Sequence, residues 1–220
     1  DVIVIRDSTV SRAEKAALLI LPGLGDGWLG RRHQRKTFSD AGYDLFIPDF
    51  HERKSFDSTV QNLRRFYRQH HLEEYREVKV LAYILGSWAL NEMIKADGRR
   101  NLSHIIYDRS PWQERAPRAV SERIPLLGRI AVGYLVIDFA KRTYPPIDTT
   151  GLRVGLLIES KATLMIKALK KTAQSYGPIA WDPDSLKQPH HDHLYIPLDH
   201  HQMYGRLEVI EKELLYFWTH

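Results

Sequence analysis

One stretch of the sequence decides the fold, Val80-Leu81-Ala82-Tyr83-Ile84-Leu85-Gly86-Ser87-Trp88-Ala89. It joins an apolar run, which predicts a strand over Val78–Leu85, to a helix predicted from about Ser87 to Ala96 and closed by Gly98. The strand is a continuous apolar run rather than an alternating one. Such a strand, leading directly into a helix, is typical of a parallel sheet that is covered on both faces.

The same alternation of apolar runs and amphipathic stretches continues in both directions along the chain. Further strands are predicted at Val2–Ile5, Ala16–Leu21, Tyr43–Ile47, Leu102–Tyr107, Arg153–Glu159 and Pro178–Trp181. Helices are predicted at Leu29–Ala41, Ser58–His70, Ser121–Lys141, Ala162–Tyr176 and Arg206–Trp218. Strands separated by single helices predict one α/β domain over residues 1–220, with a mostly parallel central sheet and helices on both faces. Residues 111–146 form a longer connection than a normal crossover and could make a small cap or lid.

The amino-acid composition excludes several classes of protein. Apolar residues make up 43% of the 220 residues, which allows a sizeable core and excludes a disordered chain. The absence of cysteine excludes disulfides, thiolate zinc sites and cysteine nucleophiles. A net charge of +5 is mild at this length, and the basic residues lack interleaved aromatic residues, so no nucleic-acid partner is expected.

The chain also lacks the marks of a membrane or exported protein. No apolar run reaches the roughly 18 residues that a membrane helix needs. The first residues show neither a basic start nor a signal-type apolar core. We therefore expect a soluble, cytoplasmic protein without a membrane partner.

Three segments together resemble the α/β-hydrolase fold superfamily. Leu19-Ile20-Leu21-Pro22-Gly23-Leu24-Gly25-Asp26-Gly27 is similar to the strand and oxyanion loop of that superfamily. Residues 41–50, Ala-Gly-Tyr-Asp-Leu-Phe-Ile-Pro-Asp-Phe, resemble its next helix end, strand and Pro-Asp turn. Residues 80–89 resemble the nucleophile elbow, a strained turn from strand to helix. The resemblance implies acyl transfer, with the backbone N–H groups of Leu24 and Leu85, beside Gly23, holding the oxyanion.

The elbow departs from the pattern of the superfamily at its most important position. Ala82 and Gly86 supply the small residues that flank the nucleophile, which places Ile84 where a serine or aspartate is expected. An aliphatic side chain cannot attack a carbonyl carbon, so the elbow looks degenerate. Ser87 is the alternative nucleophile, although Leu85 would then occupy a position that requires a small residue.

The other members of a catalytic triad have several candidates. The resemblance implies an acid near the end of the strand Arg153–Glu159, for which Glu159 and Asp108 are the candidates. It also implies a histidine after the last strand, in the stretch 189–197. His193, which is followed by apolar residues, is our prediction for the base. Four other histidines remain alternatives: His190, His191, His200 and His201.

The histidines between His190 and His201, together with Asp192 and Asp199, could instead be metal ligands. No HExxH pattern occurs, and we expect neither a specific metal nor another cofactor. Trp28 and Trp112 fall in loops at the ligand end of the sheet and could line an apolar pocket.

These residues support three functional hypotheses. The first is an α/β-hydrolase-like protein that lacks serine-hydrolase activity and binds a small acyl or aromatic ligand, or a protein partner, in the old pocket. The second is a working ester or thioester hydrolase that uses Ser87 or a histidine-activated water. The third is a metal-dependent hydrolase built on the His190–His201 cluster. The sequence leaves open whether the chain is an enzyme and whether it forms a homodimer.

Overall fold

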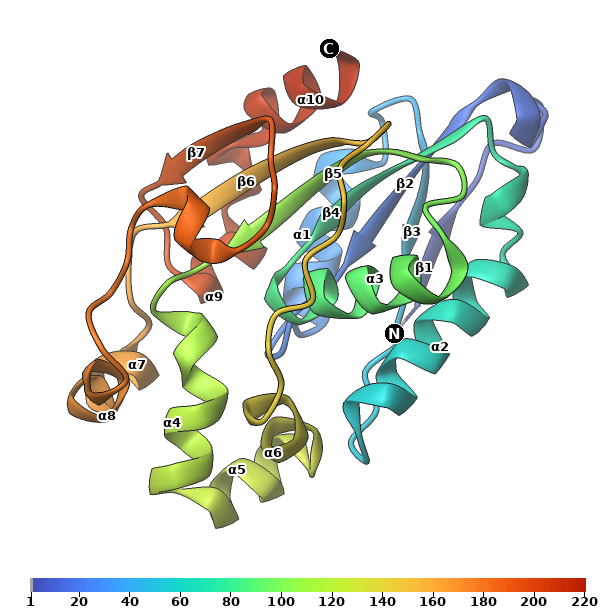
Figure 1. Cartoon of the computed structure of the whole chain (residues 1–220). Helices are drawn as coiled ribbons and strands as arrows, with labels where there is room; N and C mark the ends of the chain where they lie inside the picture. Colours follow the sequence, from blue (N-terminus) through green and yellow to red (C-terminus); the bar gives the residue numbers. More distant parts are fainter. Residues whose placement is uncertain (1) are drawn as a thin grey trace.

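A seven-stranded sheet forms the centre of the molecule, with strands in the order β1-β3-β2-β4-β5-β6-β7 (Figure 1). The computed structural model describes residues 2–220, apart from the side chains at positions 127, 129, 131 and 132. Only β1 runs antiparallel to its neighbour, so the predicted mostly parallel sheet is confirmed. The strands are β1 (Ile3–Ile5), β2 (Ala16–Leu21), β3 (Asp44–Ile47), β4 (Glu77–Ala82), β5 (Leu102–Arg109), β6 (Arg153–Glu159) and β7 (Asp192–Ile196).

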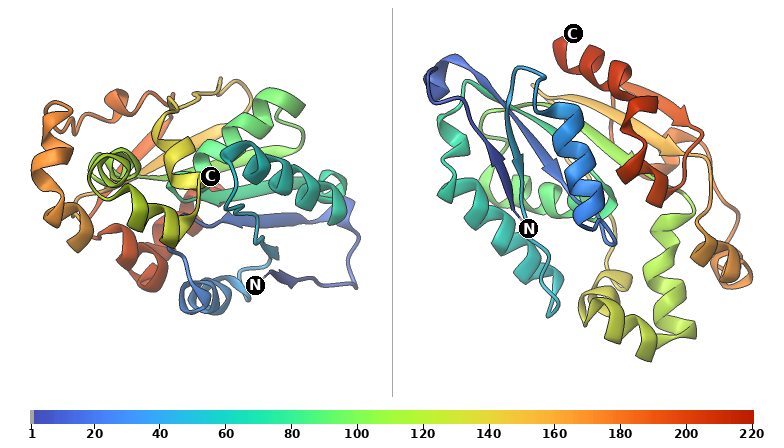
Figure 2. Two further views of the ribbon diagram at one scale, coloured as in Figure 1. Left: turned by 90° about the horizontal axis from the view of Figure 1, so that it is seen from below. Right: turned by 180° about the vertical axis from the view of Figure 1, so that it is seen from behind.

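Helices cover both faces of the sheet (Figure 2). On one face lie α2 (Phe56–Gln69) and α3 (Ile84–Asp97). On the other face lie α1 (Trp28–Phe38), α9 (His200–Gly205) and α10 (Glu211–Thr219). Alternate residues of β2 enter the two cores: Leu19 packs on the α2 and α3 side, whereas Leu18 packs on the α1 and α10 side. This double burial explains why β2 is apolar at every position.

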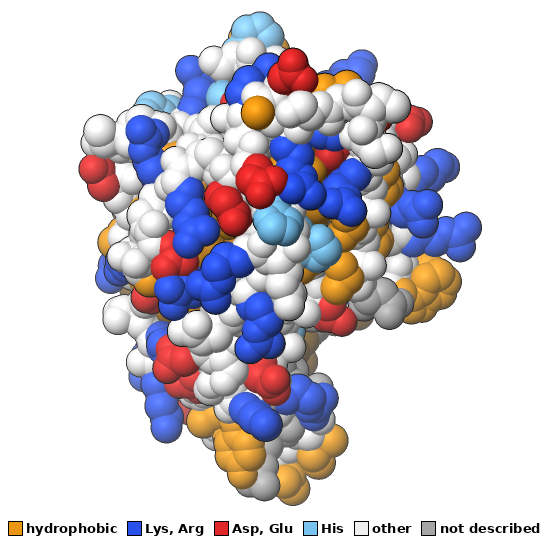
Figure 3. Space-filling view, turned by 90° about the vertical axis from the view of Figure 1, so that its right-hand side faces the viewer, with side chains coloured by type: hydrophobic (Ala, Val, Ile, Leu, Met, Phe, Trp, Pro, Cys, Tyr) orange, Lys and Arg blue, Asp and Glu red, His pale blue; other side chains and the backbone are white. Residues whose placement is uncertain are grey.

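Three helices lie between β5 and β6 at the carboxyl edge of the sheet: α4 (Ala116–Arg123), α5 (Pro125–Val132) and α6 (Leu135–Ala140) (Figure 1). Their tip exposes apolar side chains, since Leu126 and Ile130 are each about two-thirds exposed. Figure 3 shows apolar side chains gathered at the lower end of the molecule, where α5 lies in Figure 1. These helices therefore present apolar side chains to solvent as well as to the interior.

The prediction of a last strand over Pro178–Trp181 is wrong. That segment is irregular and leads into a 3₁₀ turn, and the last strand is instead β7, inside the stretch predicted to be a loop. As an edge strand, β7 pairs with β6 alone and exposes its first four residues. Edge strands tolerate polar side chains. Because β7 begins with the polar residues Asp192 and His193, its sequence does not form an apolar run.

Other boundaries move by small amounts. The predicted helix over Ala162–Tyr176 is two short helices, α7 (Leu164–Ala168) and α8 (Lys170–Ser175). Short 3₁₀ turns occur at Arg12–Glu14, Leu72–Glu74, Gln113–Arg115, Pro183–Leu186 and Leu207–Val209. Within the described part of the chain, no helix has the length and apolar character needed to cross a membrane.

Candidate functional site

The junction of β4 and α3 lies at the carboxyl edge of the sheet, where open parallel sheets bind ligands. Ile84 is the first residue of α3. Gly86 follows in close contact with β2, because a Cβ at this position would lie 2.5 Å from the carbonyl oxygen of Leu21. The close approach of strand and helix that the sequence predicts for this junction is therefore present.

No residue of this junction has the left-handed backbone that a sharply strained turn can require. Among residues 2–220, the only residues other than glycine with positive φ are His71, Arg100 and Lys187. Ile84 therefore has an ordinary conformation, which suits a β-branched residue, since left-handed geometry is costly for such side chains.

Ile84 lies at the wall of a pocket of about 320 Å³. The described residues that line this pocket include no serine, threonine, aspartate or glutamate, and their polar side chains are those of Gln113, His200 and His201. The described residues of the lining are Leu24, Gly25, Ile84, Leu85, Gln113, Ala116, Pro117, Val120, Ile124, Gly128, Val136, Phe139, Met165, His200 and His201. The pocket is thus apolar, and the helices α4, α5 and α6 supply much of its wall.

Ser87 lies one turn into α3 and is not among the described residues of the pocket wall. Its side chain is fully buried, and its hydroxyl donates a hydrogen bond of 2.7 Å to the carbonyl oxygen of Ile84. This local hydrogen bond gives Ser87 a structural role within the first turn of the helix.

His200 is held between two carboxyl groups at the ends of neighbouring strands. Its Nδ1 lies 2.7 Å from Oε1 of Glu159, the last residue of β6, and 3.5 Å from Oδ2 of Asp108 on β5. On the other side of the ring, Nε2 lies 2.8 Å from the hydroxyl of Tyr204. All four side chains are buried. The two acids predicted from the sequence therefore meet at one histidine.

A capping box fixes the position of this histidine. The carboxylate of Asp199 accepts hydrogen bonds from the backbone N–H groups of His201 and Gln202, and Oε1 of Gln202 accepts one from the N–H of Asp199. Such reciprocal bonds satisfy the unpaired donors of a helix start. They set the beginning of α9, and with it the place of His200.

Burial and mutual charge determine the protonation of this group. Burial and the negative charge of Asp108 raise the pKa of Glu159 to about 8. Burial alone would lower the pKa of His200, but the charge of Glu159, its hydrogen bond and the neighbouring Asp108 raise that pKa. These contacts favour a proton between Nδ1 of His200 and the two acids.

The loop after β2 packs against the same histidine. A Cβ at Gly23 would clash with the hydroxyl of Tyr204 and would lie 3.3 Å from Nε2 of His200, so a larger residue here would displace Tyr204. Burial, together with the charges of Asp108 and Asp26, raises the pKa of Tyr204 well above its usual value. A neutral phenol therefore lies beside the imidazole.

Comparison with solved structures identifies the fold. An epoxide hydrolase from Bacillus megaterium matches with a TM-score of 0.62 at 9% identity, over 100% of this chain and 96% of that chain. An esterase from Pyrococcus furiosus matches with a TM-score of 0.60 at 11% identity, over 100% and 89% of the two chains. An α/β-hydrolase enzyme from a lagoon-sediment metagenome of Mar Chica, Morocco, matches at 0.59 and 15% identity, over 99% and 98%.

This chain has the α/β-hydrolase fold. The comparison of its sequence with models of known families gives no match, and the comparison with curated proteins gives none either. The likeness is therefore one of fold, and the function of a chain with this fold has to be argued from its site.

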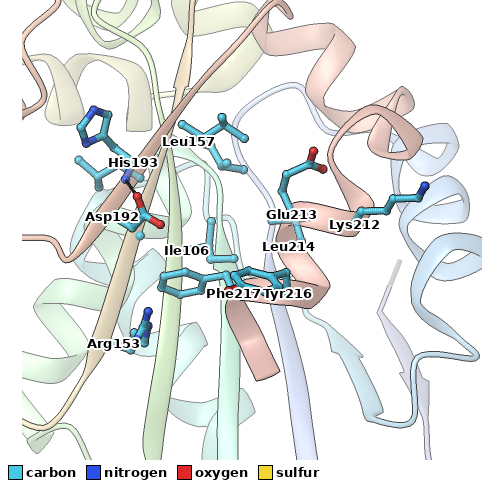
Figure 4. A pocket seen from close by; sticks show the side chains of 13 residues that line it. Ile106, Arg153, Leu157, Asp192, His193, Lys212, Glu213, Leu214, Tyr216 and Phe217 are labelled. Atoms are coloured by element: carbon cyan, nitrogen blue, oxygen red, sulfur yellow. Dashed lines mark hydrogen bonds between the residues drawn. The ribbon is translucent and has the colours of Figure 1, made fainter. Parts of the chain in front are cut away.

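Within this α/β-hydrolase fold, His193 does not join the cluster of His200. It lies on β7, and its backbone N–H donates a 2.8 Å hydrogen bond to Asp192. Figure 4 shows both residues in another groove, of about 540 Å³, between β6, β7 and α10. Once β7 is recognised as the last strand, the histidine that follows it is His200 rather than His193.

The two tryptophans and the other histidines predicted from the sequence lie outside the cluster of His200 and its two acids. Trp28 is 61% exposed at the start of α1, and neither Trp28 nor Trp112 is among the described residues of the pocket wall. Of the predicted histidines, only His200 belongs to a group of three close donor atoms among the described residues. Nδ1 of His190 bonds to the carbonyl oxygen of Gln188, and Nδ1 of His191 accepts from the N–H of Val154. Sequence reasoning missed Tyr204, whose only signal is a spacing of four residues from His200 on one helix.

Proposed function

We propose that this α/β-hydrolase-fold protein lacks serine-hydrolase activity and binds a small acyl or aromatic ligand in the pocket over Ile84. The observation that carries the proposal is the lining of this pocket. An aliphatic side chain occupies the start of α3, and no hydroxyl or carboxylate belongs to the described residues of the wall. Loss of the attacking group leaves only the modest catalysis that binding and an oxyanion site can supply.

The state of His200 supports the same proposal. A general base needs a ring nitrogen that is free to accept a proton from the reacting group. Nε2 of His200 is instead hydrogen-bonded to the hydroxyl of Tyr204. With this contact in place, the histidine is poorly suited to activate either a serine or a water molecule.

The pocket favours a ligand with an apolar body and one polar end. A volume of about 320 Å³ and mostly aliphatic walls suit a short acyl chain or an aromatic ring. The first N–H groups of a helix lack intrahelical partners, and no side chain caps the start of α3. A carbonyl oxygen of the ligand would accept a hydrogen bond at that end, near Leu85.

A binding experiment with matched variants tests the proposal. Octanoate and 2-naphthol are titrated calorimetrically into the wild-type chain, into Met165→Trp and into Leu164→Trp. Both positions lie on α7, but Met165 lines the pocket, whereas Leu164 is 82% exposed and is not among the lining residues. We expect at least one ligand to bind wild type and Leu164→Trp equally and Met165→Trp at least about tenfold more weakly.

Activity is measured on the same preparations. A fluorophosphonate probe and p-nitrophenyl acetate should reveal no labelled residue and no turnover above background. Labelling that Ser87→Ala abolishes would overturn the proposal in favour of a working hydrolase. Ligand binding that Met165→Trp leaves intact would show that this pocket is not the binding site.

A further inference from the structure

The cluster of Asp108, Glu159 and His200 has the composition of a metal site. Each residue offers one donor atom, and these three atoms all lie within 4.8 Å of one another. They come from the ends of β5 and β6 and from the start of α9. In the described part of the chain, no other group of three histidine, aspartate or glutamate donors is this close.

Unpartnered oxygen atoms are a second, separate observation at this place. Oδ1 of Asp108 and Oε2 of Glu159 are buried without a hydrogen-bond partner, and Oδ2 of Asp108 has only the ion pair with His200 at 3.5 Å. The two side chains are 0% exposed, so bulk water cannot solvate them. Buried carboxylates are normally paired, hydrogen-bonded or bound to a metal. The two unpartnered oxygens beside one imidazole are donor atoms that a bound cation would satisfy.

We propose that Asp108, Glu159 and His200 bind one divalent first-row transition ion, of the class of Zn²⁺ or Mn²⁺. One imidazole nitrogen and two carboxylates are ligands that such ions accept. His200 would bind through Nδ1, the ring nitrogen that faces both acids. The site is distinct from the expected cluster of His190 to His201, because it takes only one of those histidines and both acids from elsewhere.

Tyr204 would orient the metal-binding ring of His200 through a hydrogen bond. A histidine that binds a metal through one ring nitrogen usually donates a hydrogen bond from the other, which fixes the orientation of the ring. Nε2 of His200 is 2.8 Å from the hydroxyl of Tyr204, as this arrangement requires. The ion would join two strands to the helix that follows the last strand. It would thus act as a buried cross-link and would not require a ligand in the apolar pocket.

Metal binding to the full chain, without an affinity tag, tests this proposal. After treatment with a chelator, Co²⁺ is added and its d–d absorption is followed, and Zn²⁺ is titrated calorimetrically. We expect one equivalent of each ion to bind and to raise the melting temperature. Asp108→Asn and Glu159→Gln should each weaken binding at least about tenfold, because each removes a charged ligand.

A matched control separates this site from adventitious binding to surface imidazoles. The double variant His190→Gln/His193→Gln removes two neighbouring rings, whose centroids lie 5.6 Å apart, and leaves the buried cluster intact. This variant should bind one equivalent of Co²⁺ or Zn²⁺, as the wild type does. Circular dichroism establishes that each variant is folded.

Three results would overturn the proposal. The first is the absence of stoichiometric binding, which would mean that protons alone neutralise the acids. The second is unchanged binding in both acid variants, and the third is binding lost only in the double histidine variant. Since the readout is the ion itself, failure here leaves the proposed ligand pocket untouched.

Discussion

The hydroxyl of Tyr204 lies 2.8 Å from Nε2 of His200, on the side of the imidazole that faces the loop of Gly23. In a serine hydrolase, that nitrogen faces the nucleophile and takes its proton. Here a phenol from the next turn of the same helix occupies this hydrogen-bonding position. Restoring a serine at position 84 therefore does not by itself restore a triad.

The first prediction concerns restored esterase activity. Ile84→Ser alone should hydrolyse p-nitrophenyl acetate near background, because Nε2 of His200 stays bonded to Tyr204. The double variant Ile84→Ser/Tyr204→Phe should exceed the single variant at least about tenfold, since a free general base contributes 10²-fold or more. Tyr204→Phe alone is the control and should stay inactive. Equal activity in the single and double variants would contradict the role given to Tyr204.

The second prediction concerns the close approach of α3 and β2. Gly86→Ala should lower the free energy of unfolding by about 1–3 kcal/mol, because the new methyl group would lie 2.5 Å from the carbonyl oxygen of Leu21. Gly205→Ala is a suitable control: it also lies in a helix, and a Cβ there meets nothing within 4 Å. Urea unfolding of both variants gives the comparison. A similar stability for the two would mean that the junction is looser than it looks.

Much of the fold could be predicted from the sequence because most strands are buried on both faces. Continuous apolar runs such as Ala16–Leu21 appear at their observed bounds. The apolar pattern is lost at the sheet edge, where β7 has one neighbour and carries Asp192 and His193. A strand that is exposed at most of its positions does not need a continuous run of apolar residues, and such a run is what predicts the other strands.

The sequence indicates the two acids of the site but not the histidine beside them, and the reason again lies in the position of the strands. Residues at strand ends, such as Asp108 and Glu159, follow from the position of the strand, and both acids lie beside one histidine. The sequence pattern predicts His193 as the base, whereas the histidine that lies beside the two acids is His200, which follows β7. The contact between Gly23 and Tyr204 joins segments 181 residues apart, and no local pattern records such a contact.

The third prediction concerns the helix start that positions His200. Asp199→Ala should lower the free energy of unfolding by about 1 kcal/mol, because the N–H groups of His201 and Gln202 lose their acceptor. Asp199→Asn should retain most of the stability, since an amide oxygen also caps helices well. Denaturant melts of the three proteins provide the measurement. If alanine and asparagine are equivalent, the capping bonds do not hold α9 in place.

The last prediction is a dependence of stability on pH that arises from Asp26. Burial raises the pKa of this carboxyl group to about 6 in the folded protein, above the usual value of 3.8. A raised carboxyl pKa means that the ionised form disfavours folding. The penalty is therefore absent below about pH 4, grows between pH 4 and 6, and is complete above pH 6.

Asp26→Asn removes this penalty and keeps an oxygen that can accept the hydrogen bond from Nε2 of Gln34. The variant should match the wild type near pH 4 and exceed its stability at pH 7. Two pKa units set an upper limit of about 3 kcal/mol, and partial exposure of Asp26 to solvent reduces the gain. Urea melts at pH 4, 5, 6 and 7 measure the difference. A constant difference between the two proteins over this range would show that Asp26 does not titrate there.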